Sequence, residues 1–267
     1  MSRSSKQRSR GWNDDLHGNA PDESGVVLLL IDVINDLSFP GNKDLVRRSV
    51  ALAKSIAKLK KRCKKLGIPT IYVNDNRGRW RSDISAVLRH CLREQSPGRD
   101  MTELLVPEAD DYIVLKPKHS PFYASPLQTI LDYIGARVAI VAGVTTNACV
   151  LIAAGDLHVR DFRVFVPADC VAALTEREHR RSLDVMRIAL MPTRLLPRGS
   201  IWHDSESNSR LSAGFAKFSS SHRRLFVLIG SQHPNERLNV DEVSRAKVTK
   251  ITSDLVGKNE KTGVRVP

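Results

Sequence analysis

The chain has 267 residues, of which 41% are hydrophobic and 27% charged, and its formal net charge is +13. This length accommodates one well-packed α/β domain with extensions, or at most two small domains. The basic residues are spread over predicted helices and the C-terminal tail without a zinc-finger, RRM or helix-turn-helix signature, so we expect nucleic acid to bind only non-specifically, if at all.

Residues 1–24 are polar, charged and rich in serine and glycine, which predicts a disordered N-terminal arm. This arm has no apolar stretch of the kind that a secretory signal needs, and no later run approaches the length of a membrane span. We therefore expect a cytoplasmic protein with no membrane partner.

The first half of the predicted domain alternates strands with helices. The apolar run VVLLLID at 26–32 predicts a buried strand that ends in Asp32. An amphipathic helix is expected at 44–67, where Gly67 stops it, followed by a second strand at 68–74. A short helix near 84–92 and a strand at 112–116 that ends in Lys116 complete this half.

The second half continues the same alternation. Its predicted elements are a helix at 126–135, a strand at 137–142, a helix from Asn147 onward, a strand at 163–168, a helix at 175–190 and a last strand near 194–196. Such strands pair in parallel through right-handed crossovers. The prediction for residues 25–203 is an α/β domain, a three-layer αβα sandwich around an open, six-stranded, mainly parallel, Rossmann-like sheet.

Residues 204–267 differ in character from the preceding domain. They are serine-rich and then basic, with one short apolar run, LFVLIG, at 225–230. We interpret them as a partly disordered extension outside the catalytic core, in which the apolar run could add to a subunit contact. A homo-oligomer is the expected assembly.

Several polar residues stand where predicted strands end. Asp32, Asn74 and Lys116 end the first three strands, and Gly143 ends the fourth, shortly before Cys149. In open parallel sheets the site lies at the carboxyl ends of the strands. A thiol, a carboxylate that takes its proton and a cation are the parts of a nucleophilic hydrolase, although a helix cap or a surface ion pair would explain each charged residue alone.

Cys149 falls in or near the first turn of its predicted helix. There the free N–H groups and the helix dipole favour an anion such as a thiolate, whereas the alternative is a small buried hydrophobe, as most free cysteines are. The wide spacing of the four cysteines indicates neither a disulfide framework nor a zinc site. Cys63, Cys91 and Cys170 are interpreted as structural residues.

Three motifs together carry a family resemblance. They are LLLIDVINDL, which contains Asp32; VLKPKHSPFYASPL, which contains Lys116, Ser120 and Phe122; and AGVTTNACV, which contains Cys149. In their order and strand-end placement, residues 26–196 resemble the isochorismatase-like cysteine hydrolase superfamily, which includes nicotinamidases and N-carbamoylsarcosine amidases. The resemblance implies the isochorismatase-like hydrolase fold.

The resemblance also implies a catalytic triad of Asp32, Lys116 and Cys149, and a non-proline cis peptide between Val144 and Thr145. The backbone N–H groups of Thr145 and Cys149 would then form an oxyanion hole. Cys149 would attack the carbonyl of a small-molecule amide or ureide. Asp32 would move the thiol proton to the leaving amine, Lys116 would stabilise the thiolate, and water would then hydrolyse the thioester intermediate.

Two departures from relatives narrow the expected activity. Nicotinamidases of this superfamily carry a metal site on an Asp-x-His after the second strand, but NDNRGRW at 74–80 has no histidine, so we expect no metal or other cofactor. True isochorismatases hydrolyse a vinyl ether by protonation and lack the nucleophilic cysteine. Because this chain has Cys149, vinyl-ether hydrolysis is the alternative rather than the expected activity. A catalytically idle basic binding protein is the other alternative.

The walls of a substrate pocket are expected in the strand-end loops. The candidates are Phe39, Asn76, Trp80, Phe122 and Tyr123, although ordinary loop packing explains each equally well. His119 is interpreted as a loop residue rather than a base, and His158 and His179 as surface or packing residues.

Overall fold

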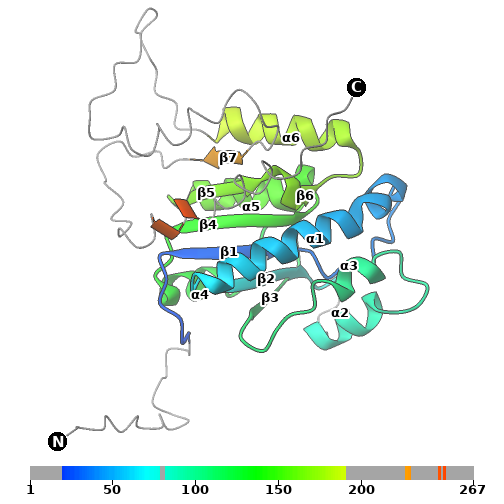
Figure 1. Cartoon of the computed structure of the whole chain (residues 1–267), viewed down its shortest axis with the longest axis horizontal. Helices are drawn as coiled ribbons and strands as arrows, with labels where there is room; N and C mark the ends of the chain where they lie inside the picture. The colour runs from blue at the N-terminus through cyan, green and yellow to red at the C-terminus, as the bar shows by residue number, and fades with distance from the viewer. Residues whose placement is uncertain (1–19, 79–81, 191–225, 230–245, 248, 251–267) are drawn as a thin grey trace, which may run out of the picture.

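The structure is a computed structural model that describes residues 20–78, 82–190, 226–229, 246–247 and 249–250 (Figure 1). Residues 1–19 of the predicted arm, Trp80, the predicted strand near 194–196 and most of residues 204–267 lie outside these ranges. None of the helices in these ranges combines the length and the apolar character that crossing a membrane requires.

The central strand β1 (Val26–Ile31) is buried along its whole length. Its alternate side chains enter two separate hydrophobic clusters, Val26, Leu28 and Leu30 on one face and Val27, Leu29 and Ile31 on the other. Because successive side chains of a strand point to opposite faces, a strand covered on both faces is apolar at every position. This explains the unbroken apolar run in the sequence.

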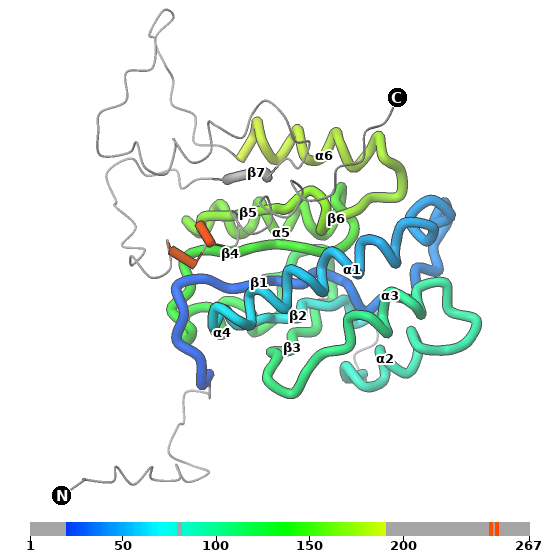
Figure 2. Tube along the Cα trace, viewed as in Figure 1, coloured from blue at the N-terminus to red at the C-terminus, as the bar shows by residue number. Residues whose placement is uncertain are grey.

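β1 lies in the middle of a sheet with the strand order β3-β2-β1-β4-β5-β7, in which the short β6 pairs with β4. Figure 2 shows β2, β1, β4 and β5 side by side. The other strands are β2 (Thr70–Asp75), β3 (Tyr112–Lys116), β4 (Val138–Val144), β5 (Arg163–Pro167), β6 (Val171–Ala172) and β7 (Phe226–Ile229). All pairings are parallel except that of β7 with β5. The predicted open, mainly parallel sheet is confirmed.

Helices cover both faces of the sheet (Figure 1). One layer contains α1 (Lys43–Lys65), α2 (Ile84–Cys91) and α3 (Arg99–Glu103), and the other contains α4 (Leu127–Ile134), α5 (Leu151–His158) and α6 (Glu176–Ala189). The long α1 buries a stripe at helical spacing that includes Leu52, Ile56, Leu59 and Cys63. The three-layer α/β architecture is therefore as predicted.

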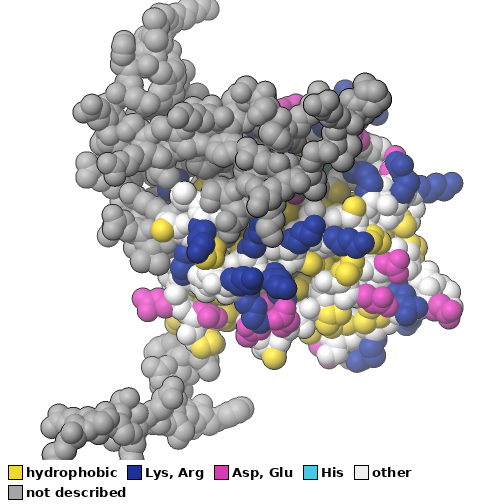
Figure 3. Space-filling model, viewed as in Figure 1, with side chains coloured by type: hydrophobic (Ala, Val, Ile, Leu, Met, Phe, Trp, Pro, Cys, Tyr) yellow, Lys and Arg dark blue, Asp and Glu magenta, His cyan; other side chains and the backbone are white. Residues whose placement is uncertain are grey.

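The solvent-facing side of α1 carries basic side chains next to acidic ones (Figure 3). Lys64 pairs with Glu108 and Asp110, and Arg47 pairs with Asp44 within the helix. Exposed ion pairs of this kind are typical of a solvated helix face.

Three short elements differ from the sequence expectation. α3 and β6 were not predicted, because five and two residues are too few for a periodic pattern to emerge. β7 lies within the range that the sequence assigns to a C-terminal extension, yet it pairs with β5 in the same sheet. At least this part of residues 204–267 therefore belongs to the sheet.

Candidate active site

Asp32 follows β1 directly and stands in the left-handed backbone region, with φ of 52°. Its backbone N–H donates to the Val73 carbonyl at 3.0 Å. The chain beyond it is fixed by Asn74, whose side chain accepts from the Ile34 N–H at 3.1 Å and donates to the Ile34 carbonyl at 2.8 Å. The carboxyl group is thus held at the carboxyl edge of the sheet with only 4% of the residue exposed.

Lys116 ends β3, and its side chain is completely buried. Its Nζ lies 2.9 Å from Asp32 Oδ2, 3.1 Å from the Lys118 carbonyl and 3.6 Å from Cys149 Sγ. These contacts engage the three N–H groups of an ammonium. The Oδ1 atom of Asp32 accepts the backbone N–H of Asp75 at 2.7 Å, so both partners of this buried ion pair are oriented by further hydrogen bonds.

Cys149 lies on a π-helical turn, Thr146–Val150, that joins β4 to α5. The turn begins after Gly143, whose φ is 130° and where an added Cβ would lie 2.0 Å from the Ile31 carbonyl oxygen, so only glycine fits there. One residue further on, the Val144–Thr145 peptide bond is cis, at the position that the resemblance implied. The oxyanion-hole role of the Thr145 and Cys149 N–H groups stays a prediction.

The ionisation of these three groups is set by burial and by each other. Burial raises the pKa of the Asp32 carboxyl more strongly than the Lys116 ammonium lowers it. Burial alone would lower the pKa of Lys116, but the Asp32 carboxylate and Cys149 raise it. Lys116 therefore stays protonated beside a carboxyl group that holds a proton more readily than an exposed aspartate.

The pKa of the Cys149 thiol differs from what the sequence predicted. Burial, and then the Asp32 carboxylate, raise the pKa of Cys149 to about 12, against the opposing influence of Lys116. The sequence predicted a lowered pKa from the helix start, whereas the direction here is upward, because the sulfur lies in a largely desolvated site beside a carboxylate. Cys149 rests as a thiol and needs a base to become a nucleophile.

His119 is the site residue that sequence reasoning missed. Its Nδ1 lies 3.3 Å from Cys149 Sγ, although the sequence indicated only a loop position beside the lysine motif. His119 is exposed, in contrast to Asp32 and Lys116. A histidine three residues after a strand-end lysine is the only sequence signal, and it does not reveal the direction of the side chain.

His179 also has a partner at the site. Its Nδ1 lies 3.0 Å from the hydroxyl of Thr146, which is fully buried in the π-helical turn. Burial lowers the pKa of His179 more strongly than Glu176 raises it, so the ring is neutral near pH 7. The interpretation of His179 as a surface or packing residue is incomplete, since it ties α6 to the turn that carries Cys149.

The predicted pocket residues have different surroundings. Asn76 is buried, its N–H donates to the Lys116 carbonyl at 3.0 Å, and its side chain accepts from Gly78. Phe39 packs against the core on the α1 side. Phe122 is half-buried beneath the Arg160 guanidinium, 4.1 Å from the ring centre, and Tyr123 is 60% exposed. Contact of these residues with a substrate stays a prediction, and Trp80 lies outside the described residues.

A second polar cluster lies at the same edge, after β1 and β2. Asp36 Oδ2 is 2.6 Å from an Arg77 guanidinium nitrogen and 2.8 Å from His90 Nε2. Burial would raise the pKa of Asp36, but its hydrogen bonds with Arg77 and His90 hold it below the usual value. In the part of the chain that the structure describes, no group of three or more His, Cys, Asp and Glu side chains is arranged to hold a metal ion.

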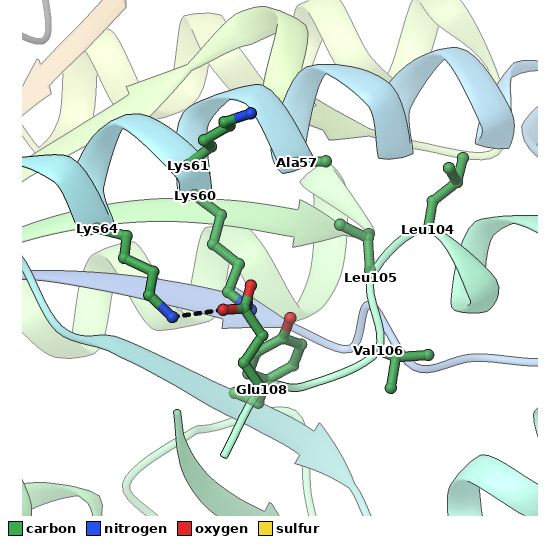
Figure 4. Close-up of a pocket in the computed structure, with 9 residues that line it drawn as sticks. Ala57, Lys60, Lys61, Lys64, Leu104, Leu105, Val106 and Glu108 are labelled. Carbon is green, nitrogen blue, oxygen red and sulfur yellow. Dashed lines mark hydrogen bonds and ion pairs between the residues drawn. The ribbon is translucent and has the colours of Figure 1, made fainter. Parts of the chain in front are cut away.

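A cavity of about 420 Å³ lies between α1 and the segment that leads from α3 to β3 (Figure 4). Its walls come from the C-terminal half of α1, from β2 and from the segment that precedes β3. Its lining residues are Ala57, Lys60, Lys61, Lys64, Tyr72, Leu104, Leu105, Val106 and Glu108. This cavity is therefore separate from Asp32 and Lys116, which follow β1 and end β3 at the carboxyl edge.

Comparisons with known proteins give a consistent match. The sequence model of the isochorismatase domain matches residues 26–194, a range that contains Asp32, Lys116 and Cys149. The uncharacterized isochorismatase family protein YaaI of Bacillus subtilis is 32% identical over 163 residues, which are 61% of this chain and 89% of that protein. Enterobactin synthase component B of Escherichia coli is 30% identical over 133 residues, 48% of this chain and 46% of that protein. A solved cysteine hydrolase from Pseudomonas syringae is 23% identical, covers 61% of this chain and 84% of its own, and has a TM-score of 0.49.

Proposed function

Since this chain belongs to the isochorismatase family of hydrolases, we propose that it is a cysteine-dependent member that cleaves the C–N bond of a small amide or ureide. One observation carries the proposal: a buried thiol lies 3.6 Å from a buried lysine that is itself 2.9 Å from a buried aspartate. These are the groups that covalent catalysis by a resting thiol requires.

In the first half-reaction Asp32 takes the proton of the Cys149 thiol, and the sulfur attacks the substrate carbonyl carbon. The raised pKa of the Asp32 carboxyl suits this role, because a base works best when its pKa approaches the working pH. Lys116 stabilises the negative charge on the sulfur through the contact at 3.6 Å. The C–N bond then breaks, and Asp32 returns the proton to the leaving amine or ammonia.

In the second half-reaction water attacks the thioester on Cys149. The new C–O bond forms as the C–S bond breaks, which releases a carboxylic acid, or a carbamic acid from a ureide, and restores the thiol. Splitting the hydrolysis into two steps lowers each barrier below that of direct attack by water. The thioester is the intermediate that distinguishes this proposal from its alternatives.

The alternatives make different use of the same scaffold. Vinyl-ether hydrolysis proceeds through protonation and requires no nucleophilic sulfur. A binding protein without catalysis requires neither the sulfur nor the buried ion pair. The thiol beside Lys116 and Asp32 favours the cysteine hydrolase over both.

The proposed reaction uses no metal. At the end of β2, where an Asp-x-His would supply metal ligands, this chain has Asp75, Asn76 and Arg77, and the guanidinium of Arg77 pairs with Asp36. An arginine cannot act as a metal ligand while it carries its charge. Activity that survives dialysis against a chelator is the expected result, and loss of activity that zinc or manganese restores would overturn this part of the proposal.

The proposal is tested by screening small amides and ureides for ammonia release by the full chain. We expect at least one compound to be turned over by the wild-type protein and not by Cys149→Ala purified in the same way. Turnover of vinyl ethers with no release of ammonia from any amide would favour the first alternative. A family substrate turned over equally by Cys149→Ala would exclude the thiol as nucleophile.

A further inference from the structure

The sulfur of Cys149 has a polar neighbour outside the aspartate and lysine pair. His119 Nδ1 is 3.3 Å from Sγ, closer than the Lys116 nitrogen at 3.6 Å. At this distance an imidazole nitrogen and a thiol form a hydrogen bond in either direction, according to which of them carries the proton. His119 therefore touches the reacting atom itself.

The three neighbours of the sulfur differ in their access to solvent. The side chain of Lys116 is completely buried and that of Asp32 is 5% exposed, whereas His119 is an exposed residue. The Lys116 ammonium already has three protein partners, and each Asp32 oxygen already accepts one protein N–H group. Of these three neighbours of the sulfur, His119 is the one that solvent reaches.

The loop that carries His119 is fixed on both sides of the residue. The Lys118 carbonyl accepts from Lys116 Nζ at 3.1 Å. On the other side, the Ser120 hydroxyl donates to Asp156 on α5 at 2.6 Å and accepts the N–H groups of Phe122 and Tyr123. An exposed imidazole on an anchored loop is pre-organised for proton transfer at small entropic cost.

We propose that His119 is the general base of the second half-reaction. This inference rests on the proposed function, since it needs a thioester on Cys149. The neutral imidazole Nδ1 takes a proton from the attacking water as its oxygen bonds to the thioester carbon. When the C–S bond breaks, its electron pair stays on the sulfur, and the imidazolium gives the proton to Sγ.

This assignment divides the proton transfers between two groups. Asp32 serves the first half-reaction from the buried side of the sulfur, and His119 serves the second from the solvent side. An imidazole suits the second task because its nitrogens can act as hydrogen-bond acceptor and as donor. The balance is complete: thioester and water give carboxylic acid and thiol, and the imidazole returns to its neutral form.

The test isolates the second half-reaction with p-nitrophenyl acetate as the acylating probe. Its leaving group departs without a proton, so loading of Cys149 with an acetyl group does not depend on an acid in the site. Acetylated full-length protein is freed of excess reagent, and loss of the acetyl group is followed by intact-mass spectrometry. General-base catalysis contributes about 10²–10⁴-fold, so we expect His119→Gln to slow this loss at least about 100-fold while the protein still acetylates.

Matched variants separate catalysis from structure. His90→Gln removes another partly exposed imidazole, one that contacts Asp36 rather than the sulfur, and should lose its acetyl group at the wild-type rate. In His119→Ala, added imidazole should restore deacetylation in proportion to its concentration. A circular dichroism spectrum and a melting temperature for each variant check that the fold is retained.

The outcomes are distinct. Deacetylation of His119→Gln at the wild-type rate, or slowing of its acetylation and deacetylation by the same factor, would overturn the role of His119 and leave the thiol mechanism standing. A wild-type protein that takes no acetyl group on Cys149 would overturn the proposed function, and the role of His119 would fall with it.

Discussion

Among the residues that the structure describes, two buried lysine–aspartate pairs lie at opposite ends of the strands of one sheet. At the carboxyl edge, Lys116 and Asp32 are 2.9 Å apart with side-chain exposures of 0% and 5%. At the amino edge, Lys60 and Asp111 are 2.6 Å apart with exposures of 8% and 6%. By distance and burial alone the two pairs are nearly the same.

Their surroundings differ. Lys60 also contacts Glu108 at 3.2 Å and lies 5.2 Å from the centre of the Tyr72 ring, both of which line the cavity of Figure 4. Lys116 instead contacts the thiol of Cys149. A buried ion pair is therefore weak evidence for a site in itself. The thiol beside Lys116 distinguishes the two pairs, and the proposed function rests on it.

The largest effect is expected for Cys149→Ala. Removal of the nucleophile should lower turnover at least about 1,000-fold, because nucleophile deletions in covalent enzymes cost factors of this size or more. Ammonia release per folded molecule is the measurement. Cys63→Ala serves as the control, since Cys63 is fully buried in the core on the α1 side and should affect stability rather than turnover.

Lys116→Met and Lys60→Met compare the two pairs directly. Lys116→Met should lower turnover per folded molecule at least about 100-fold, because it removes the cation that stabilises charge on the sulfur. Lys60→Met should leave turnover unchanged but lower the free energy of unfolding by about 3 kcal/mol, because Asp111 loses its buried partner. Urea unfolding and ammonia release on the same samples measure both quantities. Equal losses of turnover in the two variants would remove the distinction between the pairs.

The alkylation rate of Cys149 should depend steeply on pH. Since the pKa of this thiol is raised to about 12, the thiolate fraction and the rate of iodoacetamide labelling should rise about tenfold per pH unit between pH 7 and pH 9. Cys149 should still react before the other cysteines, because it is 8% exposed and they are fully buried. Peptide mapping after timed labelling measures this. A rate that levels off below pH 8 would mean that the site stabilises a thiolate.

The smallest effect concerns His179. Because its pKa is lowered from the ordinary value of 6.5, the unfolded chain binds more protons than the folded one below that pH. Its contribution to stability is therefore complete above about pH 6.5 and is lost as the pH falls through the lowered folded value. We expect wild-type protein to lose more unfolding free energy between pH 7 and pH 5 than His179→Gln does, as measured by urea titrations. Parallel pH profiles would contradict this account.

The sequence predicted the architecture well because the long elements have strong periodic patterns. The unbroken apolar run of β1 predicts a buried strand, and the amphipathic stripe of α1 predicts a helix packed on a core. The alternation of strands with helices along the chain then predicts parallel pairing. β6 escaped prediction because two residues carry no period, and β7 because its place in the sheet depends on antiparallel pairing with β5.

The site was predicted less completely than the fold. Strand-end positions were enough to bring together Asp32, Lys116 and Cys149, since the carboxyl ends of parallel strands share one edge. The contact of His119 with the sulfur depends on loop conformation, which no residue pattern encodes. The raised pKa of Cys149 depends on burial, and burial outweighed the helix-start argument that sequence position suggested.

The most direct test of the central claim is to trap the thioester. Wild-type protein that is turning over an amide or ureide from the screen is quenched in acid within the first turnovers, digested and mapped by mass spectrometry. The account predicts an added acyl or carbamoyl group on the peptide that contains Cys149 and on no other peptide. Substrate turnover with no adduct at Cys149, in samples quenched before and during the steady state, would contradict it.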